Sequence, residues 1–531
     1  MLMERMKNMP QTKLTPLALD ILRDRYLWKN DKGEVIETPD EMFHRVAHCV
    51  AQAEKPEDRN YWENEFYIVM KNLDFLPNSP TLMNAGRPFP HGQLSACFVI
   101  GIEDSMESIC EALRKQMLIH KSGGGTGFNF SALRPEGGQV NSTNGRASGP
   151  VSFMRLFDLS TEIVQQGGMR RGANMAILNC DHLDIKKFIH CKDKDGVIQN
   201  FNLSVGLTDK FMERAVEPNT SEHALLMEIA ESAWKTGDPG VVFLDTMERA
   251  NPTPELGKLN ATNPCGEQPL LPNEACNLGS INLVNMLTFD GIEYNFDLVK
   301  YKRTIAVAAR FLSDVIEVNQ YPLPEIAEAV KKTKKIGLGV MGYAHMLYYL
   351  GIPYASQDAL NYLDAIMEIL FLGAREHCTP DHTALTCIAP TGTLSLIAGV
   401  SSSIEPVFSL HHTRTYTDTW GNPHTEEIYD PVYQKLVEDG YFDHLSPELQ
   451  DAIFATAYTV SPSWHVKTQA IAQRWSDAGV SKTVNMRNNV TVEDVYNVYV
   501  DAWRMGCKGT TIYRDGSKFS QVLKCPECET F

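Results

Sequence analysis

The sequence lacks the patterns that mark secreted and membrane-spanning proteins. Residues 1–10 contain no basic segment followed by an apolar core, so no secretion signal is predicted and we expect a cytoplasmic protein. A long stretch without a charged residue, 336–357, is interrupted by four glycines and a proline. Such interruptions argue against a membrane span and favour a buried strand followed by a helix.

An excess of positive charge is also missing. The chain has 49 Lys and Arg against 66 Asp and Glu, a formal net charge of −17. This balance argues against a nucleic-acid partner held through its phosphates, so any anionic ligand must be held by local donors. The 12 cysteines cannot be interpreted as a disulfide scaffold without a secretion signal, which leaves catalysis, metal binding or burial as their roles.

The order of predicted elements indicates an α/β protein in three parts. Residues 1–85 form an N-terminal helical module, in which Thr38 and Glu41 form a capping box around Pro39. Residues 86–515 alternate short strands with amphipathic helices and contain no Pro/Gly/Ser linker, which predicts one large body, a closed barrel. Residues 516–531 form a short polar tail. Strands are expected at 96–100, 173–178, 240–244, 384–389 and 510–514, and helices at 106–120, 151–166, 224–236, 297–319, 391–398 and 492–505.

The most unusual segment runs from Asn263 to Gly279 and contains three prolines and two glycines. This composition excludes a regular helix and predicts a tight loop, from which Asn263, Cys265 and Glu267 project to one side. A thiol two residues from a carboxylate suits nucleophilic or radical chemistry, with Glu267 as proton acceptor and Asn263 as an orienting partner. The loop has no histidine to serve a conventional cysteine nucleophile, and a buried inert thiol is the alternative.

A Cys-x-x-Cys pair, Cys525 and Cys528, lies close to the C-terminal end of the sequence. It suits thiol-disulfide exchange or half of a zinc site. Zinc needs a second pair of ligands, and Cys507 is the one nearby candidate, so we favour redox exchange and predict no bound metal.

Three glycine-containing turns are candidates for binding phosphate. After an apolar strand, residues 389–397 place Pro390, Gly392 and hydroxyl side chains at the start of a helix, where free backbone N–H groups face an anion. The turn is not a Walker A motif because no lysine follows, and a plain helix cap is the alternative. Residues 122–127 carry four glycines, and residues 165–172 carry paired arginines beside glycines. These turns suit a ligand or, equally, a helix stop and a structural hinge.

Taken together, these segments resemble the catalytic subunit of a ribonucleotide reductase over nearly the whole chain, from Asp74 through the tail. The strongest motif is Asn-Pro-Cys-Gly-Glu at 263–267, with Cys276 eleven residues beyond Cys265, and Pro-Thr-Gly-Thr-Leu at 390–394 supports it. The resemblance implies a ten-stranded α/β barrel of two parallel five-stranded halves with a central finger loop.

Specific residue roles follow from the same resemblance. Cys265 would carry the thiyl radical, Cys97 and Cys276 would form the redox pair, and Asn263 and Glu267 would organise and deprotonate the ribose hydroxyls. Cys525 and Cys528 would regenerate the dithiol. Substrate contacts would fall at Ser79, Ser95, Ala96 and Gly125, with the diphosphate at Pro390, Thr391, Gly392, Thr393 and Leu394. Within an effector-binding region near 104–205, Asp104, Ser105 and Arg134 match positions that bind the specificity effector, a deoxynucleotide or ATP.

The source of the radical separates the classes of this family. The oxygen-dependent class receives it through adjacent tyrosines near the C-terminus, whereas residues 507–516 contain Tyr513 alone. This departure favours the adenosylcobalamin-dependent class. The oxygen-dependent large subunit, with Tyr513 as relay, and a non-catalytic nucleotide-binding regulator are the alternatives. We also expect a homodimer and a thioredoxin-like or glutaredoxin-like reductant. The sequence leaves open whether the substrate is a diphosphate or a triphosphate, and it assigns no role to Cys49, Cys110, Cys180, Cys191, Cys378, Cys387 and Cys507.

Overall fold

The N-terminal part of the chain is helical, as predicted. A computed structural model describes residues 14–87, 92–140, 144–164, 172–194, 196–417 and 423–517. The predicted capping box is present, since the Thr38 side chain accepts from the Glu41 N–H and the Glu41 carboxylate accepts from the Thr38 N–H. The helices here are α2 (Pro16–Arg25), α3 (Pro39–Val50), α4 (Arg59–Lys71) and α5 (Ser79–Asn84).

One short strand within this helical part joins it to the sheet. β1 (Phe75–Pro77) pairs antiparallel with β11 (Ala275–Asn282), so that Leu76 lies opposite Ser280. The chain then turns at Asn78 directly into α5, whose first residue is Ser79. This pairing fixes the start of α5 against the barrel, a connection that helical periodicity in the sequence did not predict.

Five parallel strands form the first half of the barrel. β2 (Cys97–Val99), β3 (Gly125–Asn129), β6 (Asn174–Asn179), β7 (Phe201–Leu207) and β8 (Gly240–Phe243) pair in this order, each parallel to the next. The connections carry α6 (Met106–Lys121), α7 (Pro150–Ile163) and α10 (Ser221–Thr236). These elements confirm the predicted alternation of strands and helices.

The second half is also parallel and contains one segment with little regular pairing. β11 pairs with β14 (Ile336–Met341), and β17 (Thr483–Met486) pairs with β18 (Gly509–Arg514). Between β14 and β17, the strand predicted at 384–389 is reduced to bridges at Thr386 and Ile388. Its ladder is incomplete because the Asp477 carboxylate, rather than a neighbouring strand, accepts the N–H groups of Leu385 and Thr386.

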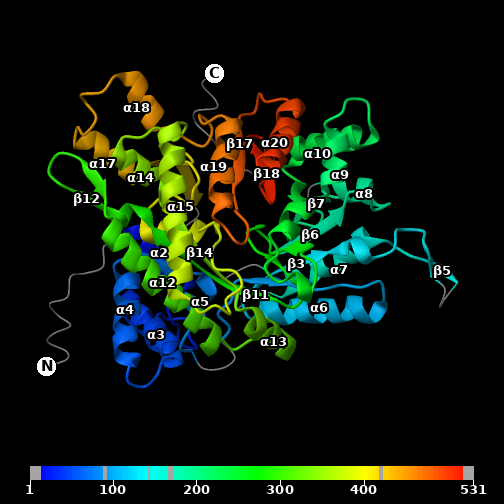
Figure 1. The fold of residues 1–531 in the computed structure, drawn as a ribbon, viewed down its shortest axis with the longest axis horizontal. Helices are drawn as coiled ribbons and strands as arrows, with labels where there is room; N and C mark the ends of the chain where they lie inside the picture. The colour runs from blue at the N-terminus through cyan, green and yellow to red at the C-terminus, as the bar shows by residue number, and fades with distance from the viewer. Residues whose placement is uncertain are drawn as a thin grey trace.

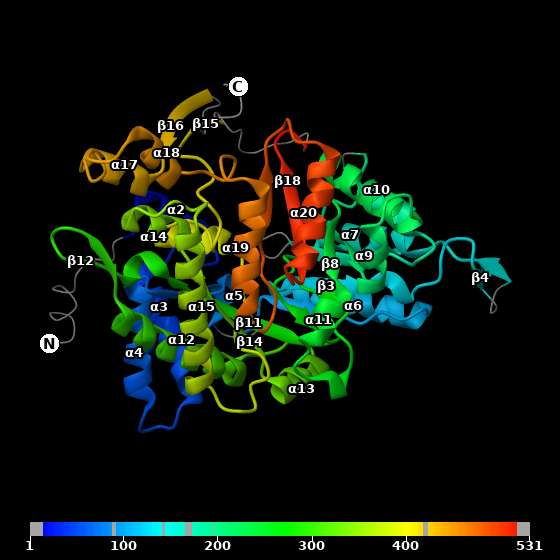
Figure 2. The ribbon, with the colours of Figure 1, turned by 45° about the horizontal axis from the view of Figure 1, so that its top comes forward.

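Two antiparallel contacts close the ring. β11 pairs with β2, and β18 pairs with β8, so two parallel halves of five segments each run in opposite directions around one barrel. Figures 1 and 2 show α6 and α7 on one side of the strands and α3, α4, α12 and α15 on the other. The buried, nearly continuous apolar strands suit a parallel sheet covered by helices.

The remaining elements complete the covering layer and the loops. Within the described residues, no helix is long and apolar enough to cross a bilayer. The other helices are α8 (Ile185–Ile189), α9 (Asp209–Ala215), α11 (Leu244–Arg249), α12 (Leu298–Val318), α13 (Pro324–Thr333), α14 (Tyr343–Leu350), α15 (Gln357–His377), α16 (Gly392–Ala398), α17 (Pro431–Glu438), α18 (Pro447–Ile453), α19 (Pro462–Arg474) and α20 (Val492–Arg504), and the hairpins are β4/β5 (Gln139–Val140, Gly145–Arg146), β12/β13 (Leu287–Phe289, Tyr294–Phe296) and β15/β16 (His411–Thr417, Pro423–Tyr429).

Candidate active site

The predicted loop at 263–268 is the turn of a short hairpin, β9 (Ala261–Thr262) and β10 (Pro269–Leu270). The Asn263 N–H donates to the carbonyl of Gln268 at 3.1 Å, and the Gln268 N–H donates to the Asn263 side-chain oxygen at 3.0 Å. Gly266 has φ +82°, a left-handed conformation that glycine adopts without strain. The turn is therefore fixed by its own hydrogen bonds.

Residues from both halves of the barrel pack closely against this hairpin. A Cβ atom on Gly127 of β3 would overlap the carbonyl oxygen of Thr262, and one on Gly479 would lie 2.7 Å from the carbonyl oxygen of Gly266. The Gly479 N–H donates to the Glu267 carbonyl at 2.7 Å, and the Asn202 side chain of β7 donates to the Pro264 carbonyl at 2.7 Å. The hairpin thus lies inside the ring, where it serves as the finger loop.

Two of the predicted thiols face each other across the seam between the halves. Cys97 at the start of β2 lies directly opposite Cys276 of β11, and both are buried. Residues paired in this way in antiparallel strands have side chains on the same face of the sheet, at a separation that suits a disulfide. Both thiols are free in the structure, which therefore describes the reduced pair.

The finger loop contacts the Cys97 thiol directly. The Asn263 side-chain amide donates to the Cys97 sulfur at 3.0 Å, and the Cys97 thiol points its proton at a Glu267 carboxylate oxygen at 3.8 Å. Burial, followed by the nearby Glu267 carboxylate, raises the pKa of the Cys97 thiol well above its usual value. Cys97 is therefore held as a protonated thiol, a form that donates a proton.

Cys276 has different surroundings. Its thiol donates to the carbonyl oxygens of Asn277 at 3.4 Å and Lys335 at 3.5 Å, and burial raises its pKa well above the usual value. The Lys335 ammonium, which is buried and lies 2.7 Å from the Glu274 carboxylate, acts in the opposite direction. Of the two thiols, Cys97 lines a cavity beside the finger loop and Cys276 does not line it, so Cys97 is the member of the pair that is placed to meet a ligand.

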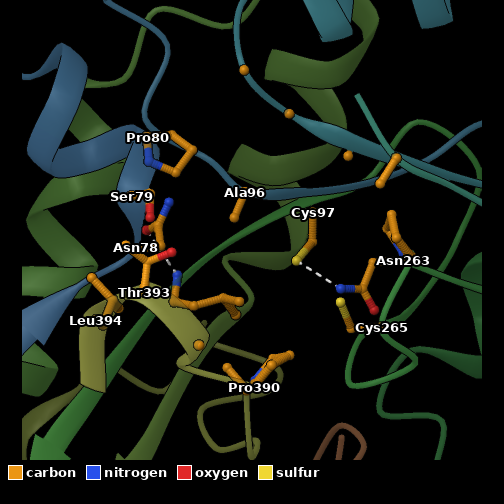
Figure 3. Close-up of a pocket in the computed structure, with 18 of the residues that line it drawn as sticks. Asn78, Ser79, Pro80, Ala96, Cys97, Asn263, Cys265, Pro390, Thr393 and Leu394 are labelled. Carbon is orange, nitrogen blue, oxygen red and sulfur yellow. Dashed lines mark hydrogen bonds between the residues drawn. The ribbon is translucent and has the colours of Figure 1, made fainter. Parts of the chain in front are cut away.

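Cys265 is the exposed residue of the finger loop, whereas Asn263 and Glu267 are buried. Its exposure is to cavities, because it lines two of them. The first cavity has a volume of about 320 Å³ and also contains Cys97, Asn263 and Glu267. Figure 3 shows the Cys265 sulfur on the same side of this cavity as the Cys97 sulfur and the Asn263 amide.

The predicted phosphate loop forms the far wall of the first cavity. Ser79, Pro390, Thr393 and Leu394 lie across the cavity from the thiols in Figure 3, and Thr391 and Gly392 also line it. No side chain caps α16, so its first N–H groups are left for a ligand. Thr391 has φ +56°, a strained conformation for a β-branched residue, and its hydroxyl accepts the Ser403 N–H at 2.7 Å.

The other predicted contacts divide into three groups. Ala96 and Gly125 line the first cavity, whereas Ser95 is buried beside it and accepts a hydrogen bond from the Asn319 side chain at 2.9 Å. The effector candidates come together at the surface, where Arg134 donates to Asp104 at 2.7 Å and Ser105 caps α6. Cys525, Cys528 and residues 165–171 of the arginine-containing turn lie outside the described residues.

Several cavity residues were not predicted from the sequence. Asn78 donates to the Leu94 carbonyl at 2.8 Å and accepts the Leu278 N–H at 3.2 Å, which joins the start of α5 to β11. His120 is buried against the cavity, and burial lowers its pKa to about 4, so its imidazole is neutral. Asn78 immediately precedes α5 and His120 lies in the last turn of α6, and no recognisable motif marks either position.

The second cavity, of about 340 Å³, also reaches the finger loop at Pro264, Cys265 and Gly266. Two buried lysines line it. Lys482 pairs with the Glu405 carboxylate and lies 2.8 Å from the His465 ring, and Lys508 donates to the carbonyls of Asp477 and Ala478, each at 2.6 Å. Burial lowers the pKa of Lys508 to about 8. Tyr513, the single tyrosine of the predicted relay segment, lines the same cavity.

Among the residues that the structure describes, no group of three or more His, Cys, Asp or Glu side chains could hold a metal ion. Cys507, two residues before β18, is buried, and burial raises the pKa of its thiol to about 12. It is therefore a packed, protonated thiol.

Comparison with known families agrees with this arrangement. The model of the ribonucleotide reductase barrel domain matches residues 95–224, 218–379 and 381–513, and that of the ribonucleotide reductase all-alpha domain matches residues 12–90. A barrel preceded by a helical module agrees with the descriptions of these two domains. The chain belongs to the ribonucleotide reductase family.

Individual relatives narrow the comparison. A vitamin B12-dependent ribonucleoside-diphosphate reductase of Thermoplasma acidophilum is 41% identical over 98% of this chain and 81% of that protein. One of Mycobacterium tuberculosis with the same description is 42% identical over 97% of this chain and 81% of its own length. A ribonucleoside-diphosphate reductase subunit alpha of Chlamydia muridarum is 27% identical over 96% of this chain and 59% of that protein.

Proposed function

We propose that this protein is an adenosylcobalamin-dependent ribonucleoside-diphosphate reductase, which converts ribonucleotides to 2′-deoxyribonucleotides for DNA synthesis. The single observation that carries the proposal is the convergence of Cys265, Cys97, Asn263 and Glu267 on one cavity inside the barrel. Relatives described as vitamin B12-dependent are 41% and 42% identical, whereas those described as subunit alpha are 27% identical. The difference favours the cobalamin-dependent class over the oxygen-dependent large subunit.

The chemistry assigns a role to each buried group. A 2′-hydroxyl is a poor leaving group, but a radical at the neighbouring C3′ allows it to depart as water once it is protonated. Cys265, as a thiyl radical, takes the 3′-hydrogen, and Glu267 accepts the 3′-hydroxyl proton. Cys97 protonates the leaving hydroxyl, which its raised pKa and its proton directed at Glu267 both support.

Cys97 and Cys276 provide the reducing equivalents for the reaction. Cys97 and Cys276 together supply two electrons and two protons and form a disulfide between them: one proton leaves with the 2′-hydroxyl as water, and the other becomes part of the new C2′–H bond. Glu267 returns its proton to the 3′-oxygen. Cys265 then returns its hydrogen to C3′, so the radical is restored and the net change is one disulfide per deoxyribonucleotide. Their opposite positions on β2 and β11 support this pairing. Cys525 and Cys528 would reduce the disulfide and in turn be reduced by a thioredoxin-like or glutaredoxin-like protein.

The second cavity fits the cofactor's reactive end. It is lined by Cys265, and its volume lies in the range of small-molecule sites. Donors there include the hydroxyls of Ser481, Thr483 and Thr511, which would hold the adenosyl group. When bound, adenosylcobalamin supplies the initiating radical. The finger loop keeps Cys265 accessible from this side while it shields Glu267, which is buried.

The proposal extends to regulation and assembly. Asp104, Ser105 and Arg134 would bind a deoxynucleotide or ATP effector at the end of α6. The exposed face of α6 and α7 carries Met106, Met117, Leu156, Leu159 and Ile163, an apolar surface that supports a homodimer built on these two helices. An effector held beside this surface would then lie next to the partner's copy of the same site.

Reconstitution tests the proposed function. The purified chain, supplied anaerobically with adenosylcobalamin, a dithiol and each ribonucleoside diphosphate in turn, should form deoxyribonucleotide without a second protein. Cys265→Ser should be inactive under the same conditions. Activity that requires an added metal-carrying subunit would contradict the cobalamin-dependent reading, and activity retained by Cys265→Ser would contradict the radical chemistry altogether.

A further inference from the structure

The substrate cavity has little positive charge for the ligand proposed to enter it. A nucleoside diphosphate carries several negative charges, and the cavity wall already contains the Glu267 carboxylate. Among the described residues that line this cavity, one has a lysine or arginine side chain, and that residue is Arg25. The chain as a whole has a net charge of −17, so no general positive field compensates.

Helix packing places Arg25 at the phosphate end of the cavity. Arg25 is the last residue of α2, which packs against α16. The N-cap of α2, Thr15, is the nearest neighbour of Gly399, the C-cap of α16, with its methyl carbon 3.9 Å from a Cβ built at the glycine. At the other end of each helix, Arg25 of α2 and Gly392 of α16 line the same cavity, which places Arg25 near the first residues of α16.

The residue that follows Arg25 is anchored on two sides. The buried Tyr26 has its hydroxyl 2.7 Å from the Ser79 hydroxyl at the start of α5, and its carbonyl accepts a hydrogen bond from Arg87 at 2.8 Å. Ser79 also lines the cavity. These contacts fix the backbone at Arg25 relative to the phosphate loop, so that its long side chain needs little ordering to reach a ligand there.

The Arg25 guanidinium has no strong competing contact. Its Nε atom lies 3.5 Å from a carboxylate oxygen of the neighbouring Asp24, and the Arg25 and Asp24 side chains are 54% and 73% exposed. A pair this open contributes little and is readily exchanged for a phosphate. A guanidinium also matches a phosphate better than an ammonium does, because its planar N–H groups donate two parallel hydrogen bonds.

We propose that Arg25 binds the terminal phosphate of the ribonucleoside diphosphate, opposite the backbone N–H groups of Thr393 and Leu394. This inference rests on the proposed function and deepens it. It makes Arg25 the residue that favours a substrate with a diphosphate over one with fewer phosphates, because a monophosphate held at the ribose end presents less charge near α2. Arg25 acts in binding and takes no part in the radical chemistry at Cys265.

Calorimetric titration of the full chain with CDP, CMP and cytidine tests the inference. Arg25→Gln should raise the Kd for CDP about 10- to 100-fold, the range of a charge-assisted hydrogen-bonded pair, and should leave the Kd for cytidine within about twofold. Arg25→Lys keeps the positive charge without the planar donors, so its Kd for CDP should lie between those of the unmodified chain and of Arg25→Gln. In turnover, Arg25→Gln should raise KM and leave kcat within about threefold.

A matched control lies two residues earlier on the same helix, on a different face. Arg23 is 62% exposed, pairs with Asp20 and does not line the cavity, so Arg23→Gln should bind CDP like the unmodified chain. An Arg25→Gln variant that binds CDP as tightly as Arg23→Gln would overturn the inference and leave the proposed function standing. A chain that binds no ribonucleoside diphosphate at all would overturn both.

Discussion

The two cavities that meet at Cys265 differ in the groups that line them. The substrate cavity contains a buried carboxylate, a protonated thiol and a neutral imidazole, at Glu267, Cys97 and His120. The second cavity contains the two buried lysines and the hydroxyls of the β17 and β18 edge. One loop of six residues, closely packed against Gly127 and Gly479, contributes Cys265 to both cavities.

This difference shows how one sulfur atom can serve two purposes. On the substrate side, groups that accept and donate protons surround the position where a ribose hydroxyl would be activated. In the second cavity the titratable groups include Asp238 and the two buried lysines, and burial lowers the pKa of Lys508 to about 8. Groups that can transfer protons therefore line both cavities, but the carboxylate that contacts the Cys97 thiol belongs to the substrate cavity.

The largest effect is expected at Glu267. Glu267→Gln removes the proton acceptor but keeps the size of the side chain, so kcat should fall about 10²- to 10⁴-fold, the usual contribution of a general base. The exposed Glu255 on the preceding loop provides a control, and Glu255→Gln should retain full activity. Steady-state kinetics of both variants measures the difference. A Glu267→Gln enzyme with normal kcat would remove the distinction between the two cavities.

The finger loop can be displaced without changing a catalytic side chain. Gly127→Ala forces the hairpin away from β3, because the new Cβ overlaps the Thr262 carbonyl, and a shift of about 1 Å in the finger loop should lower activity about 100-fold. Gly101→Ala is the control, since its Cβ would lie 3.1 Å from a proline side chain that can move. Equal activities of the two variants would show that the loop position is not critical.

The neutral imidazole of the substrate cavity predicts a pH-dependent stability. Burial lowers the pKa of His120 to about 4 in the folded chain, against about 6.5 when unfolded. The unfolded state therefore binds more protons between these values, and stability is lost as the pH falls below 6.5. At pH 5 the loss from this group is about 2 kcal/mol. His120→Gln should shrink the difference between urea midpoints at pH 7.5 and pH 5, and an unchanged difference would contradict the assignment.

The smallest effect is expected at Tyr513 in the second cavity. If the radical comes from a cofactor bound there, the phenol oxygen has no electron to relay, so Tyr513→Phe should keep kcat within about twofold. The assay is the reconstituted turnover with adenosylcobalamin and a dithiol. Loss of activity on removing this one hydroxyl would favour the oxygen-dependent alternative, in which Tyr513 carries the radical.

Motifs in the sequence predicted the chemistry better than they predicted the surroundings. The finger loop was recognisable because prolines and glycines exclude regular structure between Asn263 and Gly279, and its position inside a barrel followed from the family resemblance. The capping box at Thr38 and the alternation of strands and helices were likewise legible, since both depend on local residue patterns.

The residues that the sequence did not reveal are placed by long-range pairing. Arg25, Asn78 and His120 meet at the substrate cavity through β1 pairing with β11 and α2 packing on α16. The reduced strand at 384–389 depends on the Asp477 carboxylate, which lies about 90 positions further along the chain. Contacts between such distant positions leave no periodic trace in either segment.

Rapid-freeze electron paramagnetic resonance tests the central claim most directly. The chain, labelled with β-deuterated cysteine and mixed anaerobically with adenosylcobalamin and a ribonucleotide, should give a radical signal whose hyperfine structure changes with the label, and Cys265→Ser should give no such signal. The assignment of the radical to Cys265 would be contradicted by a label-sensitive signal that persists in Cys265→Ser. It would also be contradicted if the hyperfine structure of the signal from the active protein were the same with and without the label.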